Sequence, residues 1–101
     1  MSVSTTVSAD GSSLTINVAG RFDFHSHHDF RTAYEQVEGP QSKFIVDLSG
    51  TEYLDSSALG MLLMLRDYAG GDHAAVKITN CQEQIKDVLS IANFQKLFSL
   101  E

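Results

Sequence analysis

The chain has 101 residues, of which 43% are hydrophobic and 20% charged, and its formal net charge is −6. This length and composition fit one domain, residues 1–101, and exclude a disordered chain. The acidic balance leaves no basic stripe for phosphates, so we expect no direct nucleic-acid partner. A single cysteine excludes an internal disulfide, and the longest apolar run, residues 58–65, is too short to cross a bilayer. We expect a cytoplasmic protein without an export signal or membrane insertion.

Two short strands joined by a tight turn are predicted at the start of the chain. Residues 3–8 alternate weakly, and residues 14–18 place three aliphatic side chains on one face. The sequence Asp-Gly-Ser at 10–12 predicts a hairpin turn between them. Gly20 is expected to end the second strand.

A first helix is predicted to begin at Ser26. Ser26 and Asp29 have the spacing of a capping box, in which each side chain bonds to the other's backbone. Gly39 and Pro40 are expected to stop this helix. Apolar residues at helical spacing predict one buried stripe. The stripe consists of Phe30, Ala33, Tyr34 and Val37.

The middle of the chain predicts a buried strand followed by a buried helix. Residues 44–48 are apolar on both faces except at Asp47, as expected of a central strand covered by helices. Residues 56–68 form an almost wholly apolar helix, and Gly70 and Gly71 end it.

The last third of the chain predicts a strand at 74–79, a helix capped within 80–83, and an edge strand at 97–100. The order is therefore ββαβαβαβ. Strands that alternate with helices predict an α/β fold, with a mostly parallel β-sheet packed with α-helices through right-handed crossovers. The apolar positions of this last helix are Ile85, Val88, Leu89 and Ala92.

Small polar residues stand where the helix at 56–68 begins. Asp55, Ser56 and Ser57 precede or open this helix, so their side chains are expected near its free N–H groups. The helix dipole and these N–H groups act on any phosphate placed there, which favours a covalent charge switch at this point.

The element order and three motifs resemble the STAS domain of bacterial anti-sigma factor antagonists, over essentially the whole chain. The most specific motif is Val-Asp-Leu-Ser-Gly at 46–50 followed by Leu-Asp-Ser-Ser-Ala-Leu-Gly at 54–60. The second is Gly-Arg-Phe-Asp at 20–23, and the third is Ile-Ala-Asn-Phe at 91–94.

The resemblance implies partner switching in transcription regulation. The unphosphorylated antagonist would bind an anti-sigma factor, often itself a serine kinase, and free the sigma factor. Phosphorylation of the serine after the motif aspartate, here Ser56, would break that contact, and a metal-dependent serine phosphatase would restore it. We expect the free protein to be a monomer.

Each neighbour of Ser56 has a structural and a functional interpretation. Asp55 either caps the helix or orients Ser56 and contacts the kinase, and both can hold at once. Ser57 is interpreted as a second hydroxyl that satisfies the helix start.

The partner surface is expected to be continuous across two strand-to-helix connections. Asp23 is either an exposed turn acid or, as the resemblance suggests, a contact to the partner kinase. The outer edge of the helix near Met61 and Met64 is expected to add adaptable apolar contacts. The predicted surface consists of Asp23, Asp55, Ser56, Ser57 and Met61.

The sequence contains few features that would indicate a catalytic or metal-binding site. His27 and His28 are adjacent and diverge by about 100° on a helix, so with His25, Asp23 and Asp29 they are interpreted as a solvated cap region and not as a zinc site. No Gly-x-Ser-x-Gly elbow, phosphate loop or Walker lysine is present in the sequence. We therefore expect no enzyme activity, no metal and no cofactor.

A second function class is a STAS adaptor that does not switch, as a subunit of a lipid-transport ABC complex or a signalling scaffold. The intact Asp-Ser-Ser at 55–57 favours the switching antagonist.

Overall fold

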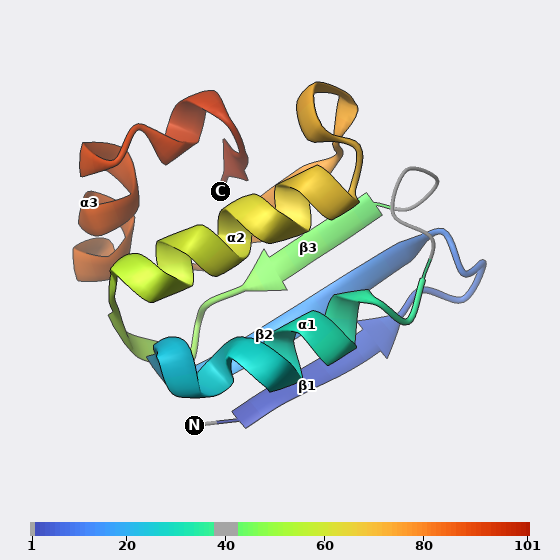
Figure 1. The fold of residues 1–101 in the computed structure, drawn as a ribbon, viewed down its shortest axis with the longest axis horizontal. Coiled ribbons are helices and arrows are strands. Elements are labelled where there is room, and N and C mark those ends of the chain that lie inside the picture. Colours follow the sequence, from blue (N-terminus) through green and yellow to red (C-terminus); the bar gives the residue numbers. More distant parts are fainter. Residues whose placement is uncertain (1, 38–42) are drawn as a thin grey trace.

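A computed structural model describes residues 2–37 and 43–101. Across these ranges, none of the helices combines the length and apolarity needed to cross a membrane. Within them, a six-stranded sheet is accompanied by three α-helices and short 3-10 turns (Figure 1). In chain order the elements are β1 (Ser2–Val7), β2 (Ser13–Phe22), η1 (Phe24–Ser26), α1 (His27–Tyr34), β3 (Lys43–Asp47), β4 (Thr51–Leu54), α2 (Ser56–Tyr68), η3 (Gly71–His73), β5 (Val76–Thr79), α3 (Glu83–Ile91), η4 (Phe94–Lys96) and β6 (Ser99–Leu100).

The sheet is mostly parallel, as predicted. Its order is β1-β2-β3-β5-β6, where only β1 pairs antiparallel, with β2. The short strand β4 is an addition to the predicted order, and it pairs in parallel with the end of β2. The mixed α/β class is confirmed, and the helix predicted at 56–68 has these bounds in the structure.

The core lies between one face of the sheet and the helices α1 and α2. Alternate residues of the parallel strands point inward and are buried, because successive side chains of a strand face opposite sides. The predicted stripe of α1 is buried at Phe30, Ala33 and Tyr34, whereas Val37 lies beyond the helix and is half-buried. The inward strand residues include Leu14, Ile16, Val18, Phe44, Val46, Val76 and Ile78.

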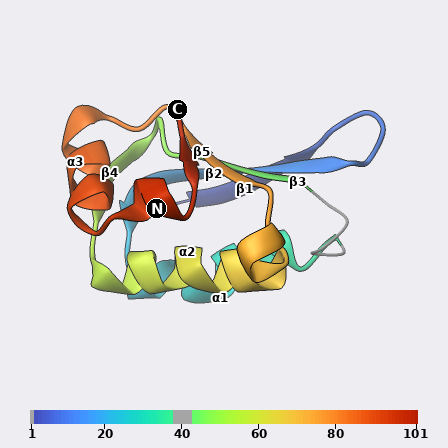
Figure 2. The same ribbon diagram turned by 90° about the horizontal axis from the view of Figure 1, so that it is seen from above.

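The other face of the sheet has no helical cover in the described part of the chain. Figure 2 shows α1 and α2 together on one side of the strands and open space on the other. Ile45 and Lys77 point to this open face and are only half-buried. The expectation that β3 is covered on both faces is wrong, since both crossovers place their helices on the same side.

The strand β2 continues past Gly20, which was expected to end it. Gly20 has a φ of 84°, and the pairing register shifts between Gly20 and Arg21. A glycine tolerates this left-handed conformation, so β2 bends there and goes on to Phe22. The bend lets β4 pair with the last residues of β2, where the buried Thr51 Oγ1 donates a 2.7 Å hydrogen bond to Val18 O.

The capping box also differs from the predicted one. Ser26 is buried, and its hydroxyl donates to Arg21 O at 3.3 Å and accepts from Asp23 N at 3.4 Å. Asp23 and Ser26 thus close η1, while the Ser26 side chain makes no capping bond to α1. The predicted capping box of Ser26 with Asp29 is wrong, because Ser26 belongs to η1 and its hydroxyl bonds to the backbone of Arg21 and Asp23. The helix stop expected at 39–40 lies outside the described residues.

Candidate functional site

The ends of β2 and β4 place two acidic side chains next to each other. The parallel register pairs Arg21 with Tyr53 and Phe22 with Leu54, so the next residues along the two strands are Asp23 and Asp55. Both strands lead into helical turns at the carboxyl edge of the sheet, η1 and α2, which contact each other (Figure 1). The sequence correctly placed Asp23 and the start of α2 at one edge.

Asp55 organises the first turn of α2. Its backbone is extended, and its Oδ1 accepts hydrogen bonds from Ala58 N at 3.1 Å and from Ser57 Oγ at 2.6 Å. The Ser57 hydrogen bond, followed by the backbone bonds, lowers the pKa of Asp55 below its usual value despite some desolvation. Asp55 is therefore the N-cap of α2, and the Ser57 hydroxyl serves the same cap.

Ser56 differs from both of its neighbours. It is the first residue of α2 and is exposed to solvent. Among the described residues, none hydrogen-bonds to its hydroxyl, whereas Ser57 is bound to Asp55. Within the part of the chain that the structure describes, the site thus presents one unpaired hydroxyl beside the hydrogen-bonded cap of a helix N-terminus.

Asp23 is more constrained than an exposed turn acid. Its carboxylate is 17% exposed and accepts from His25 N at 3.1 Å as the cap of η1. Arg21 Nε lies 3.5 Å from Asp23 Oδ2, and the Arg21 guanidinium also lies 4.0 Å from the centre of the Tyr53 ring. Asp23 therefore fixes the turn and carries a charge at the edge of the site.

Two aromatic residues at this edge were missed in the sequence. Phe24 is 71% exposed and stacks on His27 with ring centroids 6.2 Å apart, and Tyr53 is also exposed. Phe24 could have been identified from the sequence, because it is the one aromatic residue within the polar run 23–29. A large apolar residue in such a run is a candidate for exposure on the surface. The site therefore combines acidic groups with exposed aromatic surface.

Met61 does not lie on the exposed edge of α2, contrary to expectation. It is 4% exposed and shares the buried stripe of α2 with Ala58, Leu62 and Leu65. The spacing of four residues between Met61 and Leu65 places both on one helix face, whereas Met64 lies outside that stripe and is 44% exposed. Met61 therefore packs in the core beneath α2 and is not on the exposed edge of the helix.

The three histidines in this region lie in η1 (His25) and in the first turn of α1 (His27 and His28). The side chain of His25 is 91% exposed, with Nδ1 at 3.6 Å from Asp23 Oδ1. In the described part of the chain, His, Cys, Asp and Glu residues form no group of three that could hold a metal ion. The site therefore consists of hydroxyl, carboxylate and aromatic groups.

We predict that Asp55→Ala lowers the free energy of unfolding by about 1 kcal/mol, whereas Asp55→Asn lowers it less, because asparagine also caps helices well. The advantage of wild type over Asp55→Asn depends on the charge. Because folding lowers the Asp55 pKa, this advantage is complete above the usual aspartate pKa of about 3.9 and is lost as the pH falls through the lower folded-state pKa. Urea unfolding of the three proteins between neutral and acidic pH measures both effects. An advantage over asparagine that grows on acidification would contradict the assignment.

The sequence matches a known domain family over almost its whole length. A family model described as "Mlab, STAS domain" matches residues 5–100. A STAS-domain containing protein of Pseudomonas aeruginosa (strain UCBPP-PA14) is 50% identical over 100 residues, covering 99% of each chain.

Solved structures share the fold at low sequence identity. An anti-sigma factor antagonist from Mycobacterium paratuberculosis matches with a TM-score of 0.78 and 20% identity, over 98% of this chain and 85% of that one. The antagonist SpoIIAA in its unphosphorylated form matches with a TM-score of 0.72 and 18% identity, over 99% and 87% of the two chains. Its phosphorylated form, from Bacillus, matches with a TM-score of 0.68 and 14% identity, over 99% and 91%. By its sequence and its fold, the chain belongs to the STAS-domain family and resembles anti-sigma factor antagonists.

Proposed function

We propose that this protein is a phosphorylation-controlled antagonist of an anti-sigma factor. Its unphosphorylated form binds an anti-sigma factor, and so frees a sigma factor. Phosphorylation of Ser56 blocks this binding, and a serine phosphatase reverses it. The observation that carries the proposal is the free, exposed Ser56 hydroxyl on the rigid cap formed by Asp55 and Ser57.

Electrostatics support a switch at this serine. A phosphoserine adds about −1.5 to −2 charge at neutral pH. The N-terminus of α2 stabilises an anion within the free protein, so the modification leaves the fold intact. A partner packed over Ser56 would instead bury that charge beside Asp55 and Asp23, where desolvation and like-charge repulsion act together.

The surface around Ser56 favours a partner patch that is basic and partly apolar. Asp23 and Asp55 supply negative charge, and Phe24 and Tyr53 supply exposed aromatic area. Aromatic residues are enriched in protein interfaces and often dominate their binding energy. Control by phosphorylation is supported by the similar structures, because SpoIIAA is known in an unphosphorylated and a phosphorylated form.

A non-switching adaptor is the second candidate, because the matching family model carries the Mlab name. Such an adaptor would use the same surface as a permanent contact, and modification of Ser56 would have no role. The response of binding to charge at Ser56 separates the two functions.

We predict that Ser56→Asp weakens binding to the cognate anti-sigma factor by about thirtyfold or more, whereas Ser56→Ala binds like wild type. The melting temperature of Ser56→Asp should stay at or above the wild-type value, because a carboxylate in the first turn of a helix is favourable by about 0.3–1 kcal/mol. Titration calorimetry and thermal melts measure the two effects. Ser90→Asp, which adds a charge at an exposed position of α3, is the control. If Ser56→Asp binds as tightly as Ser56→Ala, the adaptor function is favoured.

We predict that Asp23→Asn weakens binding by roughly two- to fivefold, chiefly through slower association, because it removes a rim charge while asparagine keeps the cap of η1. Glu83→Gln removes the same charge from the start of α3 and should have a smaller effect. Surface plasmon resonance at several salt concentrations measures both rates, and added salt should slow association more than it speeds dissociation. A larger effect at Glu83 than at Asp23 means that the surface has been placed wrongly.

We predict that Phe24→Ala weakens binding by about tenfold or more, since burying a large aromatic side chain contributes roughly 1.5–3 kcal/mol. The matched control is Ile91→Ala, because Ile91 is 83% exposed but lies at the far end of α3. Neither side chain belongs to the buried core, so both variants should fold like wild type. Equal losses for both variants, or a loss only at Ile91, would show that the partner does not dock beside Ser56.

A further inference from the structure

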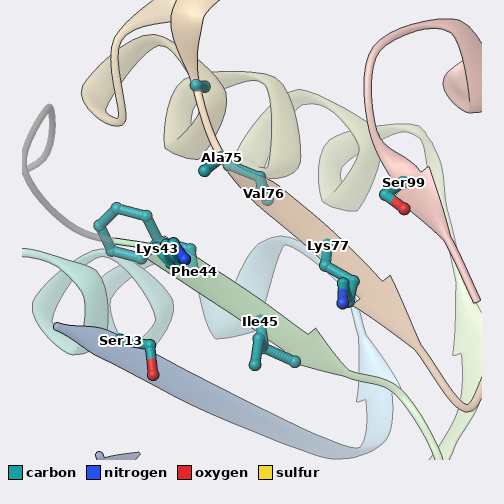
Figure 3. Close-up of a pocket in the computed structure, with 9 residues that line it drawn as sticks. Ser13, Lys43, Phe44, Ile45, Ala75, Val76, Lys77 and Ser99 are labelled. Carbon is teal, nitrogen blue, oxygen red and sulfur yellow. The ribbon is translucent and has the colours of Figure 1, made fainter.

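A hollow of about 400 Å³ lies on the open face of the sheet, at the end opposite Ser56. It is lined by the first residues of β2, β3 and β5, which are Ser13, Lys43 and Val76, by their neighbours along these strands, and by Ser99 of β6 (Figure 3). The carboxyl ends of the same strands lead toward the Ser56 site, so the two surfaces are separate.

The strand register explains why this face is hollow. Ser13 is paired with Lys43, and Ile45 is paired with Lys77, which is paired with Ser99. All five side chains share one face because they occupy alternate positions of paired strands. Small side chains at Ser13, Ser99 and Ala75 therefore lie beside the taller side chains of the two lysines and Ile45.

The shortness of β6 leaves the hollow open at one side. This strand has two residues and pairs only with Lys77 and Ile78 of β5. In the described part of the chain, β6 does not extend beside Ala75 and Val76. The hollow therefore extends beyond the first residue of β6, and the aliphatic side chains of Ile45 and Ala75 line it.

The charge of the hollow is opposite to that of the protein. The chain has a net charge of −6, yet two of its four lysines, Lys43 and Lys77, line this hollow. Lys77 Nζ lies 3.0 Å from Glu101 Oε2, and this contact is the main reason why the pKa of Glu101 is lowered. At the rim of the hollow, Lys77 therefore already forms an ion pair with the carboxylate of Glu101.

We propose that this hollow binds a small organic acid, with its apolar body against Ile45 and Ala75 and its acid group at Lys43 and Lys77. The volume falls within the range of about 300–1,000 Å³ typical of small-molecule sites. Charge-assisted hydrogen bonds from the lysines would orient the acid group. Glu101 competes with the ligand for Lys77, so the site has a weak internal inhibitor.

The proposal is tested by titrating ¹⁵N-labelled full-length protein with decanoate, 1-naphthoate and decan-1-ol. At least one acid should shift the amide signals of Ile45, Ala75 and Lys77 in a saturable way, and the acid that does so shows whether the apolar body is a chain or a ring. Decan-1-ol, which lacks the acid group, should not. Shifts confined to other residues, equal binding of the alcohol, or no saturable shifts with either acid would overturn the proposal.

Four variants separate shape from charge in this site. Ala75→Leu fills the hollow at an exposed position and should abolish binding, and Lys43→Gln should weaken it by about tenfold. Glu101→Gln should tighten binding several-fold, because it frees Lys77 and removes a like charge. Lys96→Gln, outside the hollow, is the control. Unchanged binding in Ala75→Leu, or weaker binding in Glu101→Gln, would contradict the assigned site.

Discussion

The parallel pairing between the end of β2 and β4 determines where every group of the candidate site lies. This pairing brings Tyr53 beside Arg21 and sends Asp23 and Asp55 out of the sheet side by side. It depends on the bend at Gly20 and on the buried hydrogen bond from Thr51 to β2. Because β4 passes directly into α2, the same pairing also fixes the start of that helix and the place of Ser56.

A switch at this point needs little movement inside the protein. Asp55 accepts hydrogen bonds from the Ser57 hydroxyl and from the Ala58 N–H, and these bonds form the cap of α2. The hydroxyl of Ser56 makes no hydrogen bond among the described residues. A charge added there changes the surface potential and not the packing, since the core side of α2 is formed by Ala58, Met61, Leu62 and Leu65. The effect of modification should therefore be felt by a partner and hardly by the fold.

The elements with a strong periodic pattern could be predicted from the sequence. The inward face of β2 follows directly from its alternating apolar residues, and the bounds of α2 follow from the cap residues before its apolar run and the glycines after it. Features that depend on distant contacts could not be predicted: β4 does not alternate regularly between buried and exposed residues, and its pairing needs the bend at Gly20.

The same limit explains the errors at the candidate site. Met61 was expected on the surface because α2 is apolar on nearly every side, so its sequence does not show which stripe faces the sheet. Ser26 was assigned to the cap of α1 because η1, which takes up its hydroxyl, was not predicted. In contrast, Asp55, Ser56 and Ser57 were placed correctly, since a cap at a strand-to-helix junction is determined by local sequence.

Control of partner binding by Ser56 is tested by measuring phosphate content and partner binding on one sample. The protein would be phosphorylated to increasing extents by the cognate kinase with ATP, mapped by mass spectrometry, and mixed with the anti-sigma factor for native mass spectrometry. We expect that phosphate appears on Ser56 and that the bound fraction falls in proportion to it, while the amide spectrum changes only near the start of α2. Phosphate on Ser57 alone, or full binding by protein phosphorylated at Ser56, would contradict it.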